Sequence, residues 1–305
     1  MDALAPLIAA AMNAGTPLML AALGLLINEK SGVINLGSEG MMLVAAALGF
    51  ALTVQTGSTA VGFAGGAVVG ALMAGLFAWL VVWLGANQIA CGLALSLFGV
   101  GLSASIGLPY VGATIQASTW SVPVLSGIPF VGPALFQHHP MVYGALGLSV
   151  LLSLFLYRTR AGLVLRAVGE SPESAHALGY PVRRIRLAAL LFGGACCGLA
   201  GAFMSLVYTP MWVENMVAGR GWIALALTPF ATWRPLRVLI GAYLFGGITI
   251  LTYHMQALGV PIASQLLSML PYLATILVLV LISRNVDWIR INMPASLGRV
   301  FNPNS

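Results

Sequence analysis

The segment 24–31 is the part of this sequence that comes nearest to a nucleotide-binding motif. It begins with Gly24 and ends with Lys30-Ser31, which is the spacing of a phosphate-binding P-loop. Glu29 stands where the second glycine of that loop is required, and its carboxylate would repel a nucleotide phosphate. The segment also ends an apolar run instead of following a strand. We therefore expect that the chain does not hydrolyse ATP by this route.

The histidines and cysteines give no sign of a metal or redox site. The histidines lack zinc-type spacing with cysteines or carboxylates, and the cysteines all lie in apolar runs, two of them adjacent. These residues are His138, His139, His176, His254, Cys91, Cys196 and Cys197. Because no metal cluster and no nucleophile–base pair can be assembled from them, we expect no metal, no cofactor and no enzymatic activity.

Glu39 is the charged residue that stands out most, because it lies shortly before the apolar run 43–50. A charge in such a place is costly unless it is paired or faces water, and it is a functional candidate for that reason. The carboxylate can line a polar path, cap the first turn of its own helix, or pair with Lys30 or an arginine. These roles stay open at the level of sequence.

Neutral polar residues form a second group of candidates. Asn87-Gln88 opens an apolar run, and helical spacing places Gln88, Ser96 and Ser103 on roughly one side of it. Such a stripe suits a neutral, hydroxyl-rich solute, and it equally suits hydrogen bonds between helices. The candidate residues for a translocation path are Asn35, Glu39, Asn87, Gln88, Ser96 and Trp222.

The composition indicates that membrane-spanning helices position these candidate residues. Of 305 residues, 60% are hydrophobic and 7% are charged, whereas a soluble domain is about 25% charged. This excludes a cytosolic enzyme, a secreted disulfide scaffold, a disordered chain and a nucleic-acid binder. A bilayer core of about 30 Å needs roughly 20 apolar residues per helix. We expect one all-α domain over residues 1–305, a polytopic transmembrane helical bundle of about nine spans, with a range of eight to ten.

The distribution of lysine and arginine predicts the topology. The expected spans cover 6–27, 34–54, 60–84, 89–108, 141–157, 187–208, 217–232, 236–255 and 265–283. With the N-terminus outside, nine crossings place nearly all lysines and arginines inside, as the positive-inside rule requires. The loop 109–140, which contains five prolines, then lies outside.

Two of the expected spans are weak and open on glycine-broken stretches, at 36–40 and 218–222. Either of them can be re-entrant. Paired interrupted spans can mark a transport path between related halves of a protein. Two independent glycine-rich helix starts would give the same pattern.

The segment 158–186 holds six of the 13 basic residues and carries the strongest local signal. Ser171 is a suitable N-cap before Pro172 at the first helical position, and Gly179 stops the helix. A cytoplasmic helix of about two turns, 172–178, is therefore delimited at both ends. Its small residues allow another protein to approach closely, although an amphipathic loop resting on lipid headgroups is an alternative. The candidate coupling residues are Glu170, Ser171, Pro172, Glu173, Ala175, Leu178 and Gly179.

The segment 166–186 resembles the coupling region of the integral-membrane permeases of ATP-binding cassette importers. The branch in question serves branched-chain amino acids, simple sugars and nucleosides. Three further stretches, 28–40, 87–96 and 218–226, look like its nucleoside and simple-sugar members. The resemblance extends over most of residues 15–283. Asn is common in the family where this chain has Ser96, and Ala is commoner where it has Ser174.

This resemblance implies a multi-pass protein of a bacterial cytoplasmic (inner) membrane that imports a nucleoside or a simple sugar. It implies cytoplasmic ATPase subunits, a second permease subunit that is homologous or identical, and an extracytoplasmic solute-binding protein as partners. Apart from these proteins the chain contacts the lipid bilayer, and no nucleic acid is expected. The alternatives are a branched-chain amino acid permease of the same family and an ion-coupled secondary transporter. An ion-coupled carrier usually needs titratable groups near the membrane midplane, and few are present.

Overall fold

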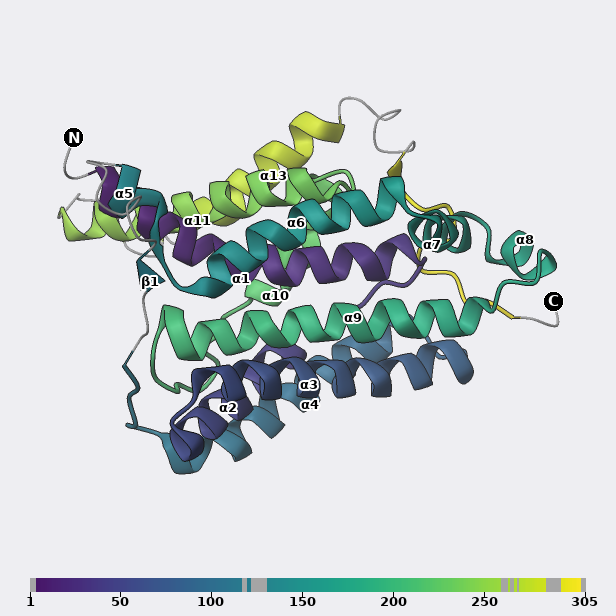
Figure 1. The fold of residues 1–305 in the computed structure, drawn as a ribbon. Helices are drawn as coiled ribbons and strands as arrows, with labels where there is room; N and C mark the ends of the chain where they lie inside the picture. The colour runs from purple at the N-terminus through teal and green to yellow at the C-terminus, as the bar shows by residue number, and fades with distance from the viewer. Residues whose placement is uncertain are drawn as a thin grey trace.

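The computed structural model describes residues 4–116, 120–121, 131–258, 263, 266–267, 269–283 and 292–302. These residues form a helical bundle with one small two-stranded sheet (Figure 1). The long helices are α1 (Leu4–Lys30), α2 (Ser38–Thr56), α3 (Thr59–Ala78), α4 (Gln88–Gly107), α6 (Pro140–Arg158), α9 (Val182–Phe203) and α11 (Pro235–Ala257). The shorter helices are α5 (Val131–Leu135), α7 (Arg160–Glu170), α8 (Pro172–Ala177), α10 (Arg220–Phe230) and α13 (Leu270–Ser283).

Seven helices in the described part of the chain are long and apolar enough to cross a membrane. They are the seven long helices, three of which are lengthened by an adjoining turn. α3 continues into a π-helical turn at Trp79–Trp83, α4 into a 3₁₀ turn at Leu108–Tyr110, and α9 into a π-helical turn at Met204–Tyr208. The expected all-α polytopic bundle is therefore confirmed.

α10 accounts for one of the two remaining expected spans. Its 11 residues make a helix of about 16 Å, which is about half the thickness of a bilayer core. The residues before it, 209–219, are not helical. The expected span at 217–232 is thus a half-helix preceded by irregular backbone. α13, with 14 residues, corresponds to the expected span at 265–283.

The bundle has two chemically different ends. α1 finishes at Lys30 close to α7, α8 projects from the same end, and the C-terminal residues run past it (Figure 1). We call this the basic end, because Arg158, Arg186 and Arg299 lie there. The opposite end carries α5 and the sheet, and we call it the β1 end.

The proline-rich segment 109–140 is broken into short elements, as its prolines require. β1 (Trp120–Ser121) pairs antiparallel with β2 (Gln137–His138); residues 117–119 and 122–130 lie outside the described part. His139 then caps α6, and its Nδ1 accepts a hydrogen bond from the backbone N–H of Met141. Burial lowers the pKa of His139, which favours the neutral imidazole that this hydrogen bond needs.

Glycines let α3 and α9 pack backbone against backbone. A Cβ at Gly70 would lie 2.2 Å from the carbonyl oxygen of Gly194, and one at Gly198 would lie 2.1 Å from that of Gly66. The Gly66/Gly70 face is therefore a helix-packing face, as its four-residue spacing indicates. This face joins α3 to α9, and the polar candidate residues lie on other helices.

Candidate functional site

The two glycine-broken stretches meet inside the bundle. α2 begins at Ser38 and α10 begins at Arg220, and the first turns of these helices touch each other. A Cβ at Gly221 would lie 2.6 Å from the backbone of Glu39, so only glycine allows this approach. The hydroxyl of Ser38 also donates a hydrogen bond to the carbonyl oxygen of Gly221. We call this contact the α2–α10 junction.

Glu39 closes the junction from α2. Its Oε1 accepts a hydrogen bond from the N–H of Gly219 at 2.8 Å, and its Oε2 accepts one from the N–H of Gly221 at 2.7 Å. The side chain is 5% exposed. A carboxylate at the positive end of a helix is stabilised by the helix dipole and by unsatisfied N–H groups. Glu39 is therefore the N-terminal cap of α10, a helix other than its own.

The junction lies near the middle of the bundle. Gly40 packs against α4, where a Cβ at Gly99 would lie 2.3 Å from the Gly40 Cα. Gly99 is eleven residues beyond Gln88, the first residue of α4, which corresponds to about 16 Å along the helix. Gly107, near the far end of α4, contacts Trp212. Residues 212–221 therefore lie in the half of the bundle toward the β1 end.

The remaining polar candidates on α4 and before α2 hold the chain that leads to the junction. Ser96 donates a hydrogen bond to the carbonyl oxygen of Leu36, and Gln88 accepts one from the N–H of Ile34. Asn35 Oδ1 accepts from the N–H of Gly37. Each of these three polar side chains is buried. The structure thus brings Asn35, Glu39, Gln88 and Ser96 together around one segment, residues 31–40.

Asn87 and Trp222, the other path candidates, lie apart from this group. Asn87 is the N-cap of α4, and its side chain accepts hydrogen bonds from the N–H groups of Ile89 and Ala90. Trp222 lies in the first turn of α10 and is 36% exposed.

Glu29 holds the other end of α10. Its Oε2 accepts hydrogen bonds from the hydroxyl of Thr228 and from the indole N–H of Trp233. Thr232 and Trp233 both have positive φ angles, a strained conformation for side chains of this size. The buried carboxylate stabilises this turn directly after α10. Two acidic residues ten positions apart therefore fix the two ends of the half-helix.

The irregular segment before α10 is open on one side. Val213 is 49% exposed, and Glu214 and Asn215 are also exposed. At the start of α10 the Arg220 guanidinium lies 5.2 Å from the centre of the Tyr208 ring. Non-helical backbone at membrane depth is tolerated only where it is buried in protein or lines a water-filled cavity. Residues 213–215 are uncovered in the single chain, and they lie just after Met211, which pairs with Thr114 beyond the end of α4.

At the basic end the expected helix 172–178 is present as α8, Pro172–Ala177. Ser171 is its N-cap, and its hydroxyl oxygen accepts a hydrogen bond from the N–H of Ser174. Gly179 follows with a φ of +88°, a value that favours glycine. The helix boundaries expected from the sequence are thus confirmed to within one residue.

α8 offers only part of its surface to a partner. Leu178 is 78% exposed, and Glu173 and Gly179 are exposed as well. Ala175, however, is 3% exposed and packs in a small apolar cluster with Val168, Val182 and Phe301. Pro172 is also buried. Ala175 and Pro172 therefore face the chain itself, which the sequence pattern did not indicate.

Residues 7–282 match the family described as the branched-chain amino acid transport system permease component. The chain belongs to this permease family.

Named proteins resemble the chain over most of its length. It is 40% identical to a putative glucose ABC transporter permease protein, TsgC13, of Haloferax volcanii, over 98% of both chains. It is 33% identical to a nucleoside ABC transporter permease protein, NupC, of Lactococcus lactis, over 87% of this chain and 88% of NupC. It is 28% identical to a guanosine ABC transporter permease protein, NupQ, of Bacillus subtilis, over 86% and 87%. No solved structure matches the chain.

The permease is thus a multi-pass protein of the cytoplasmic membrane and a transport protein of the ABC class. An ABC permease works with an ATPase subunit and a solute-binding protein. In the described part of the permease, no group of three metal-ligating side chains comes together.

Sequence reasoning missed two features of the permease. The role of Glu29 was hidden, because its partners lie 199 and 204 positions away in the sequence. The partners of Glu39 lie 180 and 182 positions away. The only signal for the second was the pair of glycine-broken stretches, one in each half of the chain.

Proposed function

We propose that this permease forms one half of a translocation path for a nucleoside or a simple sugar, and that α8 receives the cytoplasmic ATPase. A second permease subunit, homologous or identical, supplies the other half. An extracytoplasmic binding protein delivers the solute at the β1 end. The named relatives favour this solute class, since they are named for glucose, nucleosides and guanosine.

The observation that carries this proposal is the open segment 213–219 beside the α2–α10 junction. It is irregular, it includes the exposed polar residues Glu214 and Asn215, and it runs from Trp212, beside the far end of α4, to the junction at Glu39. Since lipid cannot satisfy its backbone groups, an aqueous path shared with a second subunit gives it a suitable surrounding. The short span of α10 continues this path toward the basic end.

The side chains along this segment suit a polar solute with a flat ring. Trp222 is partly exposed in the first turn of α10, and the Arg220 guanidinium lies over the Tyr208 ring. Aromatic faces bind sugar and base rings by stacking, and guanidinium groups donate hydrogen bonds to hydroxyl and carbonyl oxygens.

A branched-chain amino acid is the second candidate solute. Arg220 and the exposed Glu214 carry opposite charges on the same segment, which suits the carboxylate and ammonium groups of a zwitterion. The description of the family also names branched-chain amino acids as its solutes.

The test of the function is ATP-driven uptake into liposomes. The permease is reconstituted with its ATPase subunits, ATP is enclosed, and the binding protein is added outside with labelled guanosine, uridine, glucose or leucine. We expect accumulation of guanosine, uridine or glucose only when ATP is present. Accumulation of leucine alone would identify the amino acid branch. Uptake by the permease alone under a proton or sodium gradient would overturn the proposal.

The orientation is tested by labelling single cysteines. Ser174 on α8 and Gln116 at the β1 end are both exposed, so each can be replaced by cysteine in a cysteine-free background. In intact cells, an impermeant maleimide should label Gln116→Cys and leave Ser174→Cys unlabelled until the membrane is opened. Labelling of both positions from outside would show that the basic end does not face the cytoplasm.

A further inference from the structure

Residues 292–302 run across the basic end and touch most of the elements there (Figure 1). We call them the C-terminal strap. Lys30, the last residue of α1, donates a hydrogen bond to the carbonyl oxygen of Asn292 at 2.6 Å. The N–H and the hydroxyl of Ser296 both donate to the carbonyl oxygen of Gly169 in α7. The N–H of Gly298 donates to the carbonyl oxygen of Gly32.

Arg186 binds the strap to the chain that leads into α2. Its guanidinium donates hydrogen bonds to the carbonyl oxygens of Ser31 and Arg299 and to the hydroxyl of Ser296. The side chain is 3% exposed, and burying its charge would be costly without these hydrogen-bond acceptors. Gln88 also donates to the carbonyl oxygen of Arg299. The strap is thereby tied to the segment 31–40, which ends at the α2–α10 junction.

The far end of the strap lies against α8. Phe301 is 7% exposed and packs with Ala175 of α8, Val168 of α7 and Val182 of α9. Its ring also meets the ring of His176 edge-on, with 5.6 Å between ring centres. Phe301 therefore touches the one helix that is proposed to receive the ATPase.

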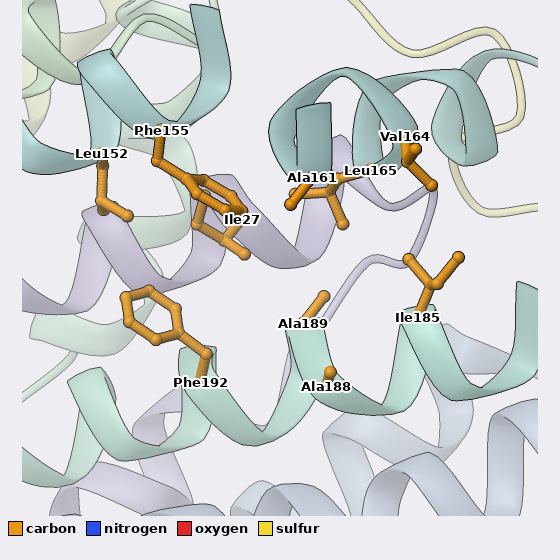
Figure 2. Close-up of a pocket in the computed structure, with 10 residues that line it drawn as sticks. All are labelled: Ile27, Leu152, Phe155, Ala161, Val164, Leu165, Ile185, Ala188, Ala189 and Phe192. Atoms are coloured by element: carbon orange, nitrogen blue, oxygen red, sulfur yellow. The ribbon is translucent and has the colours of Figure 1, made fainter. Parts of the chain in front are cut away.

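α7 and α9 pack together through Val168 and Val182 beside Phe301 but leave a space elsewhere between them. A cavity of about 450 Å³ lies between these helices, α1 and α6. Figure 2 shows apolar side chains pointing into it, Ala161 and Leu165 from α7 and Ile185 and Ala188 from α9. Close packing transmits displacement, whereas an unfilled space does not. Movement of α8 can therefore reach the segment 31–40 through the packed strap, in addition to the direct contact of Gly169 in α7 with the backbone of Lys30 and Gly32.

We propose that the C-terminal strap links the coupling helix α8 to the α2–α10 junction, with Phe301 as the positioning residue beneath α8. The contacts run from α8 through Phe301 to Arg299 and Arg186, and from there to segment 31–40 and Glu39. This inference rests on the proposed role of α8 as the docking site of the ATPase.

The test compares Phe301→Ala with Val300→Ala in the complete reconstituted complex. Val300 is the neighbouring strap residue and is 46% exposed, so it is the matched control. ATP hydrolysis and uptake are measured together, with whichever of guanosine, uridine and glucose the wild-type complex transports. We expect Phe301→Ala to raise the ATP consumed per solute molecule about fivefold or more, while Val300→Ala stays at the wild-type ratio. Phe301→Leu, which keeps an apolar side chain there, should restore most of the coupling.

These variants distinguish coupling through the strap from a purely structural role of Phe301. An unchanged ratio in Phe301→Ala overturns the inference, and so does an equal loss in Val300→Ala. If Phe301→Ala does not assemble, Phe301→Val is measured in its place, and it should also raise the ratio because the side chain no longer fills the space beside Ala175. A wild-type ratio at reduced thermal stability in that variant would assign Phe301 to folding alone and overturn the inference. Leu178→Ala is measured alongside. If it uncouples the complex while the Phe301 variants do not, the role of α8 stands and the strap fails; if neither uncouples it, the docking proposal itself fails.

Discussion

Replacing Glu39 with alanine is expected to lower the free energy of unfolding by about 3 kcal/mol. Two hydrogen bonds to a charged acceptor are lost, and each contributes roughly 1.5–3 kcal/mol to stability. The cost of burying the carboxylate, which the alanine variant no longer bears, offsets part of this loss. The N–H groups of Gly219 and Gly221 would be left without their acceptor. Because these groups begin α10 beside the proposed path, uptake should fall with stability. Thermal unfolding of the purified permease in detergent and ATP-driven uptake measure the two effects.

The control for this prediction is Glu214→Ala. Glu214 is an exposed carboxylate a few residues before α10, so its removal should change the unfolding temperature very little. Glu39→Gln keeps one acceptor oxygen but turns an NH₂ group toward the second N–H, and it should be nearly as unstable as the alanine variant. A Glu39→Ala permease with wild-type stability would show that the cap on α10 contributes nothing.

Replacing Leu178 with lysine is expected to abolish ATP-driven uptake almost completely. Leu178 is a hydrophobic side chain with 78% of its surface exposed, and an unpaired charge buried in a packed interface costs several kcal/mol, about enough to prevent docking. On a loop that merely rests on anionic headgroups, the same lysine would be favourable by about 1 kcal/mol. Co-purification of the ATPase with the permease and uptake into liposomes are the measurements.

Leu163→Lys is the matched control for the docking prediction. Leu163 lies on α7 and is 58% exposed, so the same charge is introduced near α8 but off the proposed docking surface. Its effect on ATPase binding should be small. If Leu178→Lys retains normal uptake, or if both variants lose it equally, the ATPase does not dock on the exposed side of α8.

The burial of Ala175 changes how the coupling helix can be tested. A bulky charged residue at this position would displace Phe301 and disturb the packing of the chain itself. A loss of coupling in such a variant would not show contact with a partner. Variants at Leu178 test the exposed side of α8, and variants at Phe301 test the side that packs against the chain itself.

Most of the fold follows from local properties of the sequence. A run of apolar residues long enough to cross a bilayer must become a helix there, since its backbone groups have no other partners. The expected span 89–108 thus matches α4, which begins at Gln88. The boundaries of α8 also follow from local chemistry, because Ser171 and Gly179 act within one turn of the helix.

The α2–α10 junction could not be predicted in the same way, because its contacts join residues that are far apart in the sequence. From the sequence, the glycine-broken stretches at 36–40 and 218–222 could be a path or two unrelated helix starts. Only the fold brings Glu39 to Gly219 and Gly221, about 180 positions away.

By itself, the sequence determined the membrane class, the helical elements and the caps of α8, since apolar length, charge placement and capping act over a few residues. Only the tertiary structure decided that Glu29 and Glu39 accept hydrogen bonds at the two ends of α10, and that Phe301 packs against the buried side of α8. Several polar partners can satisfy a buried carboxylate, and several side chains can cover a small apolar face. The choice among them is made by packing across the whole bundle, where a single glycine such as Gly221 decides which backbones can meet.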